Sequence, residues 1–257
     1  VKTIPSHFSP VHEATKMDFT TVFGSESDPN YHRFHIGQPL DMDIPVCLNL
    51  DRFVERSNAI FGKSGTGKSF LTRLALSGII KQDVAVNLVF DMHNEYGWQA
   101  LSENKGETVV KGLKQIFSHK VSVFTLDPKS SRKRGIVDAC EIAIPYHQID
   151  IDDLALIKHE LNLSEASIES AMILEEALGK YWFSSFLNMG GEDIEEFVAT
   201  GKGHAGALKA LQRKLGRVTR LSYIKPDVSY DSINQIMRCI ETEKHVILEF
   251  GGQNSLL

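Results

Sequence analysis

Cysteine is scarce in this chain, and the three that occur, Cys47, Cys140 and Cys239, lie far apart with no C-x-x-C pair. This spacing excludes the common zinc frameworks and a dense disulfide frame, and it is typical of reduced thiols. Long uncharged apolar runs are lacking, and so is a charged-then-apolar leader at the start. We therefore predict a cytoplasmic protein with no membrane partner.

An excess of positive charge is also lacking, because the formal net charge is -5. That balance argues against a uniformly basic surface that coats nucleic acid, although it leaves room for positive charge confined to one surface. The 257 residues, of which 42% are hydrophobic, suffice for one substantial core and a smaller appendage.

What the chain does contain is one phosphate-binding pattern, GKSGTGKS, at residues 62–69. Its glycines lack the Cβ atoms that would obstruct a phosphate, so successive backbone N-H groups can wrap around it. Lys68 is expected to reach the β- and γ-phosphates, and the Ser69 hydroxyl to ligate Mg²⁺. We predict a site for ATP and Mg²⁺ formed by Gly62, Lys63, Ser64, Gly65, Thr66, Gly67, Lys68, Ser69 and Phe70.

The segments around the pattern predict a β-α-β unit. Residues 57–61 read as a short strand, residues 68–81 carry apolar side chains at helical spacing, and residues 84–96 begin as a buried parallel strand. A right-handed crossover places the end of the second strand at the sheet edge where ligands bind.

Acidic side chains follow that second strand. Asp91 and Glu95 are therefore candidate catalytic residues that hold Mg²⁺ or orient the attacking water, and Asp91 is also the candidate Mg²⁺ ligand. The alternative interpretation makes Asp91 and Asn94 ordinary turn formers after a strand.

The combination of GKSGTGKS, a helix and a strand closing in DMHNEY resembles the HerA family of hexameric DNA-pumping ATPases. Asp91, His93, Glu95 and Tyr96 match the family's D-x-H-G-E-Y signature, and Asn94 replaces its glycine. Asparagine tolerates the left-handed conformation better than most residues. The resemblance is strong over residues 36–98 and topological beyond them.

This resemblance implies an ATP-dependent DNA translocase of the helicase type, working as a homo-hexamer on DNA, with a NurA-like nuclease as a partner. Its role would lie in DNA end processing, repair or defence. Lys68 would stabilise the charge on the transferred phosphoryl group, and a neighbouring subunit would supply an arginine.

The implied fold is α/β, a RecA-like P-loop NTPase with a parallel sheet flanked by helices. We expect a remnant of an N-terminal β-barrel in residues 1–50, the first part of the ATPase core in 51–148, a helical insertion in 149–223 and the rest of the core in 224–257. Hydrophobic periodicity further predicts the following elements: strands within 17–36 and at 121–126, 136–144 and 245–250, and helices at 107–117, 152–161, 164–187, 193–198 and 204–221.

The end of the sequence bears on the catalytic assignment. The apolar strand at residues 245–250 is followed by GGQNSLL, which reads as a turn entering a helix. In the family a second acidic motif comes later, so we expect this chain to be a fragment of a longer protein. Either Asp91 and Glu95 perform the metal and water chemistry, or they support a site whose main acids lie elsewhere.

Two basic clusters bear on partners. One is the loop PKSSRKRG, with Lys129, Arg132, Lys133 and Arg134. The other comprises Lys209, Arg213, Arg217 and Arg220, which fall on one face of the helix expected after residue 203. Each is either a solvated surface or a contact for a phosphate backbone.

Two other classes of function remain open. A small-molecule kinase shares the phosphate loop, but it would need an arginine-rich lid, of which the helical region gives no clear sign. A nucleotide-gated assembly or switch protein would bind ATP, hydrolyse it slowly and move nothing.

Overall fold

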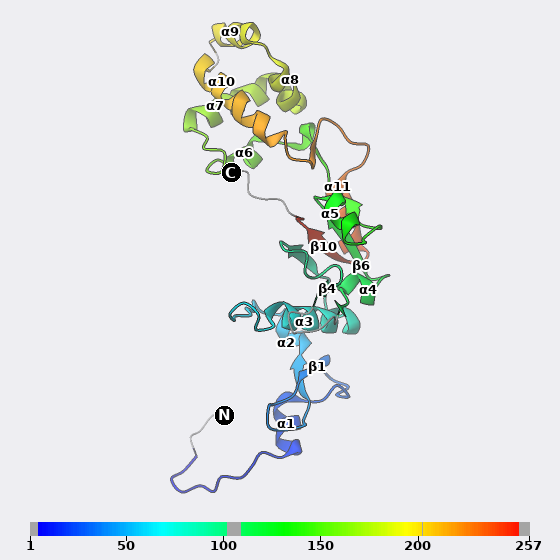
Figure 1. Ribbon diagram of the computed structural model, residues 1–257. Coiled ribbons are helices and arrows are strands. Elements are labelled where there is room, and N and C mark those ends of the chain that lie inside the picture. The colour runs from blue at the N-terminus through cyan, green and yellow to red at the C-terminus, as the bar shows by residue number, and fades with distance from the viewer. Residues whose placement is uncertain (1–4, 102–108, 202, 252–257) are drawn as a thin grey trace. The chain divides into compact units, whose positions relative to one another are not determined.

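The computed structural model describes residues 5–101, 109–201 and 203–251, and these divide into two compact units. The first unit contains the described residues up to Asn87, and the second contains those from Leu88 onward. Figure 1 shows the helices and strands of both units, coloured along the chain.

The first unit packs a helix against an antiparallel hairpin. Strands β1 (Arg33–Gly37) and β2 (Val46–Asn49) pair, and the short helix α2 (Leu50–Val54) follows directly. The long helix α3 (Lys68–Gln82) lies against this hairpin, where Phe34, Leu50 and Ile79 form the buried core. A Cβ added to Gly78 would come within 2.7 Å of the Phe34 ring, so a glycine permits the close approach of the helix.

Two sequence predictions in the first unit are wrong. The expected strand at the beginning of residues 17–36 is instead the helix α1 (Lys16–Phe23). A capping box starts it, because Thr15 and Asp18 exchange side-chain hydrogen bonds with each other's backbone N-H. Residues 57–61 form no strand, and Asn58 there donates instead to the carbonyls of Phe53 and Arg56, turning the chain. The barrel remnant stays a prediction.

The second unit is built on a parallel sheet of four strands in the order β3, β10, β6, β7. Their bounds are Leu88–Asp91, His245–Glu249, Val121–Thr125 and Cys140–Glu141. Helix α11 (Ser232–Glu241) packs through Ile236 and Ile240 on one face, where Phe124 and Val246 are buried. The predicted strands at 121–126 and 245–250 are confirmed, as is the α/β fold with a parallel sheet flanked by helices.

Other predicted elements of this unit are shorter than expected. The strand predicted from residue 84 is only β3, and its Leu88 and Phe90 are 42% and 61% exposed rather than buried. In the described part of 107–117 lie a two-residue strand β5 (Val109–Val110), which pairs with β4 (Ala100–Leu101), and helix α4 (Leu113–Ile116). The strand predicted at 136–144 is split into β7 and β8 (Ile144–Pro145), because β8 leaves the main sheet to pair with β9 (Ile224–Lys225).

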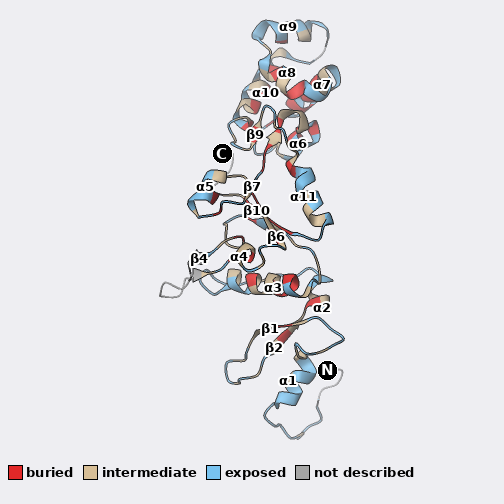
Figure 2. Ribbon diagram, turned by 90° about the vertical axis from the view of Figure 1, so that its right-hand side faces the viewer, coloured by how far each residue is buried: buried red, intermediate tan, exposed pale blue. Residues whose placement is uncertain are grey.

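Between β8 and β9 the chain forms a helical bundle. Its helices are η1 (Tyr146–Gln148), α6 (Ile151–Leu156), α7 (Glu165–Leu178), η2 (Gly179–Tyr181), α8 (Trp182–Asn188), α9 (Gly191–Ala199) and α10 (Ala205–Val218). Trp182, Phe183, Phe186 and Leu208 lie in its single apolar core, and Figure 2 shows the buried faces in red.

The bundle confirms the helical character predicted for residues 149–223, but not a single helix over 164–187. Ser164 caps α7 as predicted by accepting from the Ser167 N-H at 3.2 Å. Gly179 then ends α7, because its φ of 67° and ψ of -153° lie outside the helical region. Whether the bundle is an insertion stays a prediction.

Candidate functional site

The phosphate-binding pattern forms a compact loop before α3. Gly65 and Gly67 have φ values of 76° and 88°, a conformation that glycine adopts without strain. Thr66 closes the turn, since its backbone N-H donates to the Lys63 carbonyl at 3.3 Å and its hydroxyl to the same oxygen at 2.7 Å. A Cβ on Gly62 would come within 2.5 Å of the Thr66 hydroxyl, so this close approach also requires glycine.

The start of α3 offers hydrogen-bond donors to an anion. Gly67 provides no side-chain cap to the helix, and the first turn carries no acidic residue. The first N-H groups of the helix and the positive end of its dipole therefore lie at the same place, and both favour binding of an anion there. Lys68 Nζ donates to the Lys63 carbonyl at 2.7 Å, which holds the ammonium across the loop.

These features fit the phosphates of a nucleotide. The glycines leave room for phosphate oxygens, the helix start supplies backbone donors, and Lys68 supplies a positive charge at the loop. Ser69, the second residue of the helix, has the hydroxyl expected to hold Mg²⁺. The helix predicted at 68–81 is confirmed.

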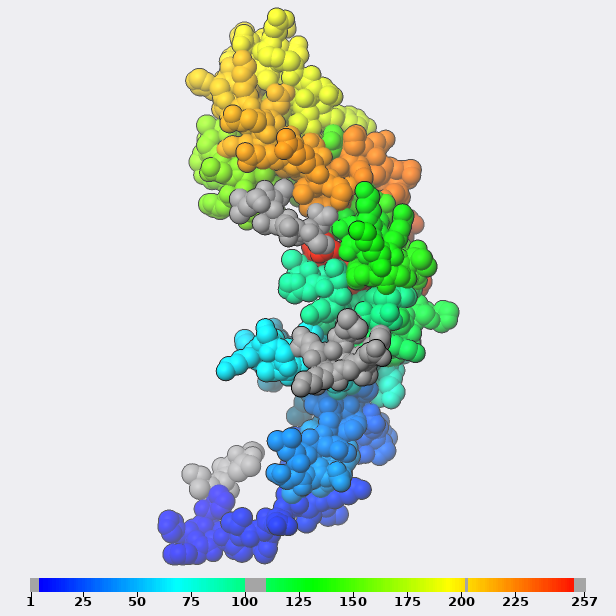
Figure 3. Space-filling model, in the orientation of Figure 1, coloured from blue at the N-terminus to red at the C-terminus, as the bar shows by residue number. Residues whose placement is uncertain are grey.

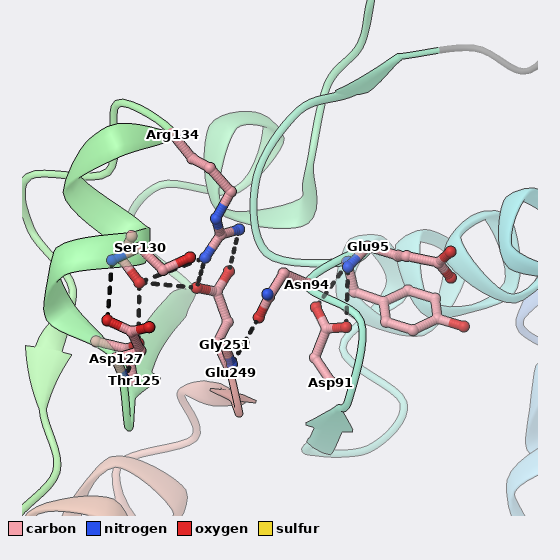
Figure 4. A network of polar contacts seen from close by, with 11 residues as sticks. Asp91, Asn94, Glu95, Thr125, Asp127, Ser130, Arg134, Glu249 and Gly251 are labelled. Carbon is pink, nitrogen blue, oxygen red and sulfur yellow. Dashed lines mark hydrogen bonds and ion pairs between the residues drawn. The ribbon is translucent and has the colours of Figure 1, made fainter. Parts of the chain in front are cut away.

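In the second unit, the carboxylate of Asp91 organises the DMHNEY turn. Its two oxygens accept the backbone N-H groups of Glu95 at 2.9 Å and Tyr96 at 2.8 Å, and the side chain is fully buried. Asn94 has a φ of 57°, the left-handed conformation expected where the family signature has glycine. Figure 4 shows the Glu95 carboxylate pointing away from the buried network.

Asp91 belongs to a row of buried polar side chains across three strands. In the parallel register, Asp91 of β3 is the partner of Glu249 in β10, and Glu249 is the partner of Thr125 in β6. All three have no exposed surface. Register partners on adjacent strands project to the same face, and these residues end their strands, so the row lies at the carboxyl edge of the sheet where ligands of α/β proteins bind.

Glu249 is held by an ion pair with Arg134, the residue after helix α5 (Pro128–Lys133). Arg134 Nη2 lies 2.5 Å from Glu249 Oε2, and Nη1 lies 3.3 Å from Oε1. The Ser131 hydroxyl lies 3.2 Å from Glu249 Oε2 and 2.9 Å from the Thr125 hydroxyl, and its single proton can be donated to one of them at a time. The two hydrogen bonds between the Arg134 guanidinium and the Glu249 carboxylate fix the position of both side chains.

A direct contact joins the two acidic segments. The Gly251 N-H donates to Asn94 Oδ1 at 3.2 Å, which links the DMHNEY turn to the segment after β10 (Figure 4). Two glycines permit close packing around this contact: a Cβ on Gly97 would lie 2.7 Å from Glu249 Oε1, and one on Gly251 would lie 2.5 Å from Asp127 Cβ. The turn after β3 and the end of β10 therefore form one structural unit.

The predicted site residues therefore fall into two sets. The contiguous phosphate loop lies in the first unit, and Asp91 and Glu95 lie in the second. The sequence pattern predicted no role for Glu249, Thr125 or Ser131, and it indicated Arg134 only as part of a basic loop. A signal for Glu249 existed, because HVILE is an apolar strand ending in an acid, as is LVFD before the turn.

Among the residues that the structure describes, no group of three or more His, Cys, Asp and Glu side chains is placed to hold a metal ion. None of the described helices has the length and apolar character needed to cross a membrane.

Comparison with known proteins adds one finding. Residues 34–257 match the sequence family described as "Helicase HerA, central domain". No curated protein and no solved structure matches the chain. Because the match extends over most of the sequence, including the phosphate loop and the DMHNEY turn, the chain belongs to the HerA helicase central-domain family.

Proposed function

We propose that this protein is a motor ATPase that couples hydrolysis of Mg-ATP to movement along DNA. The observation that carries the proposal is a glycine-shaped phosphate loop at the uncapped start of α3, in a chain of the HerA helicase central-domain family. Membership in this family supports ATP hydrolysis in general, and we further propose that the hydrolysis drives translocation along DNA.

In this proposal the loop residues bind and orient ATP. The backbone N-H groups of the loop and of the first turn of α3 hold the β-phosphate, while Lys68 neutralises charge that develops on the transferred phosphoryl group. Ser69 holds Mg²⁺, which supplies further neutralisation of the phosphate oxygens when bound. Phe70, 57% exposed, borders the same helix start.

The two acids of the turn have different roles in the proposal. Both oxygens of Asp91 accept backbone hydrogen bonds in a fully buried position, which favours holding the turn over direct coordination of Mg²⁺. The DMHNEY turn fixes the backbone of Glu95, which is the remaining candidate for orienting the attacking water. Asp91 is then a positioning residue for Glu95.

DNA, a homo-hexameric ring and a NurA-like nuclease complete the proposal. They rest on membership in the HerA family, whose members are generally hexameric and associated with DNA. A neighbouring subunit would supply the arginine that the transition state needs.

Replacement of Lys68 by alanine is expected to lower ATP hydrolysis by about 100-fold or more, because it removes the cation that the proposal assigns to the transferred phosphoryl group. The measurement is release of inorganic phosphate with and without duplex or single-stranded DNA. Lys180→Ala is the matched control, since Lys180 is exposed in the helical bundle. Stimulation of the unchanged protein by DNA supports the motor, whereas folded protein that hydrolyses ATP with no response to either DNA form contradicts it.

A second candidate, a nucleotide-gated switch, is favoured by one observation. The two buried carboxylates at the sheet edge, Asp91 and Glu249, are both engaged, one with backbone N-H groups and one with Arg134. With both carboxylates engaged in this way, a switch protein would bind ATP tightly and hydrolyse it slowly. Tight binding of ATP together with DNA-independent, near-zero turnover would identify the switch.

A further inference from the structure

Helix α10 carries an unusual separation of charge. From Ala205 to Arg220 the sequence contains five cations, Lys209, Arg213, Lys214, Arg217 and Arg220, and no acid. Its neighbours in the bundle are acidic: α7 contains four glutamates, and α9 contains three glutamates and one aspartate, with no cation in either. In a chain with a net charge of -5, such segregation produces a local positive surface.

The packing of α10 sets the direction of its cations. Leu208, Leu211, Leu215 and Val218 are buried in the core of the bundle. At about 100° of rotation per residue, Lys209, Arg213 and Arg217 span an arc of about 80° on the opposite side of the helix. These three residues are exposed, as is Arg220 in the turn that follows, and Figure 3 shows the α10 segment in yellow-orange at the surface.

Three of these cations have no partner of their own within the described part of the chain. Lys209 forms an ion pair with Glu195 at 2.8 Å, and Lys214 donates to the Asn162 carbonyl. The guanidinium groups of Arg213, Arg217 and Arg220, in contrast, form no hydrogen bond or ion pair with any described residue. Three free guanidinium groups therefore lie on one exposed face, about two helical turns long.

We propose that this face, formed by Arg213, Arg217 and Arg220, binds the phosphate backbone of DNA. Guanidinium groups bind phosphate through paired hydrogen bonds, and a row of them along a helix suits a polymer whose charges are also in a row. The contact is independent of base sequence, because it engages phosphates only. The inference rests on the proposed function and assigns its DNA contact to the helical bundle.

The test compares two triple variants of the same residues. Arg213→Gln, Arg217→Gln and Arg220→Gln together remove three charges, whereas the corresponding Arg→Lys changes keep them. Binding of a fluorescently labelled duplex of mixed sequence is titrated without nucleotide, between about 50 and 200 mM salt. Because no ATP is present, a protein that fails to hydrolyse ATP still gives a clear result here.

The slope of log K against log salt is negative, and the glutamine variant is expected to make it less steep by about 2.7, since each phosphate contact with duplex DNA contributes about 0.9 to its magnitude. Binding at about 0.1 M salt should weaken roughly 100-fold, and the lysine variant should keep the slope. Unchanged circular dichroism and thermal melting establish that the variants are folded.

A matched control removes three charges outside both basic clusters through Lys180→Gln, Arg238→Gln and Lys244→Gln, all exposed positions. An equal loss of slope in this control would assign the effect to net charge and overturn the proposal. So would an unchanged slope in the α10 glutamine variant. The proposal is equally overturned if labelled poly-glutamate binds the face as well as DNA, or if the glutamine variant loses self-association instead of DNA binding.

Discussion

Two buried carboxylates lie side by side on neighbouring strands, and they are stabilised in different ways. The Asp91 carboxylate is stabilised by hydrogen bonds from two backbone N-H groups of its own turn, four and five residues further along the chain. Glu249 depends on Arg134, which is 115 residues away in sequence. A fully buried charge is tolerated only when such partners are present, so both arrangements are essential to the sheet edge.

The two partners of the ion pair are expected to differ in their effect on stability. Arg134→Met leaves Glu249, with 0% of its side chain exposed, as a buried charge without its cationic partner, and should lower the free energy of unfolding by about 3 kcal/mol or more. Glu249→Gln leaves Arg134, which is 28% exposed and reaches water, and should cost about 1 kcal/mol.

Urea unfolding followed by tryptophan fluorescence provides the measurement, because Trp98 and Trp182 both lie in the second unit. The double variant completes a cycle that isolates the pair. Equal losses from the two single variants would argue against this account of the buried pair.

Among the elements, the helices of the bundle show what hydrophobic periodicity can predict and what it cannot. The periodicity correctly indicated helices within 164–187 and 204–221, because each turn contacts the same core. It did not indicate the break at Gly179, since apolar residues continue on both sides of it. The sheet was harder: residues 57–61 and 84–87 have strand-like composition, but a strand requires a hydrogen-bonded neighbour, which composition does not supply.

Two glycines in the bundle make a matched pair. Gly179→Ala should lower the free energy of unfolding by about 1–3 kcal/mol, because alanine is strained at a φ of 67° and a ψ of -153°. Gly216→Ala, within α10, should raise it by about 0.5–1 kcal/mol, because alanine favours the helix. A Cβ at either position meets no atom within 4 Å, so the backbone alone decides.

Urea titrations of the two variants check this prediction. A loss of stability from Gly216→Ala, or none from Gly179→Ala, would contradict it.

For the whole molecule, the proposed function requires residues from more than one copy of the chain. We expect the protein with ATP, Mg²⁺ and DNA to sediment at about six times the 28.7 kDa mass of one chain. Lys68→Ala should reduce this assembly if bound nucleotide links neighbouring subunits. Analytical ultracentrifugation provides the measurement, with Lys180→Ala as the control. A particle that remains a monomer under all these conditions would contradict the ring.

The phosphate loop could be predicted from the sequence alone, as could the helix that follows it and the helical faces of the bundle, including the basic face of α10. Each of these depends on residues that are close together in the chain, so spacing and residue type are sufficient to define it. The folded chain was needed to show that Asp91, Glu249 and Thr125 form one buried row and that Arg134 pairs with Glu249. Those contacts join distant segments, and they exist because the strands pair in an order that differs from their order in the sequence.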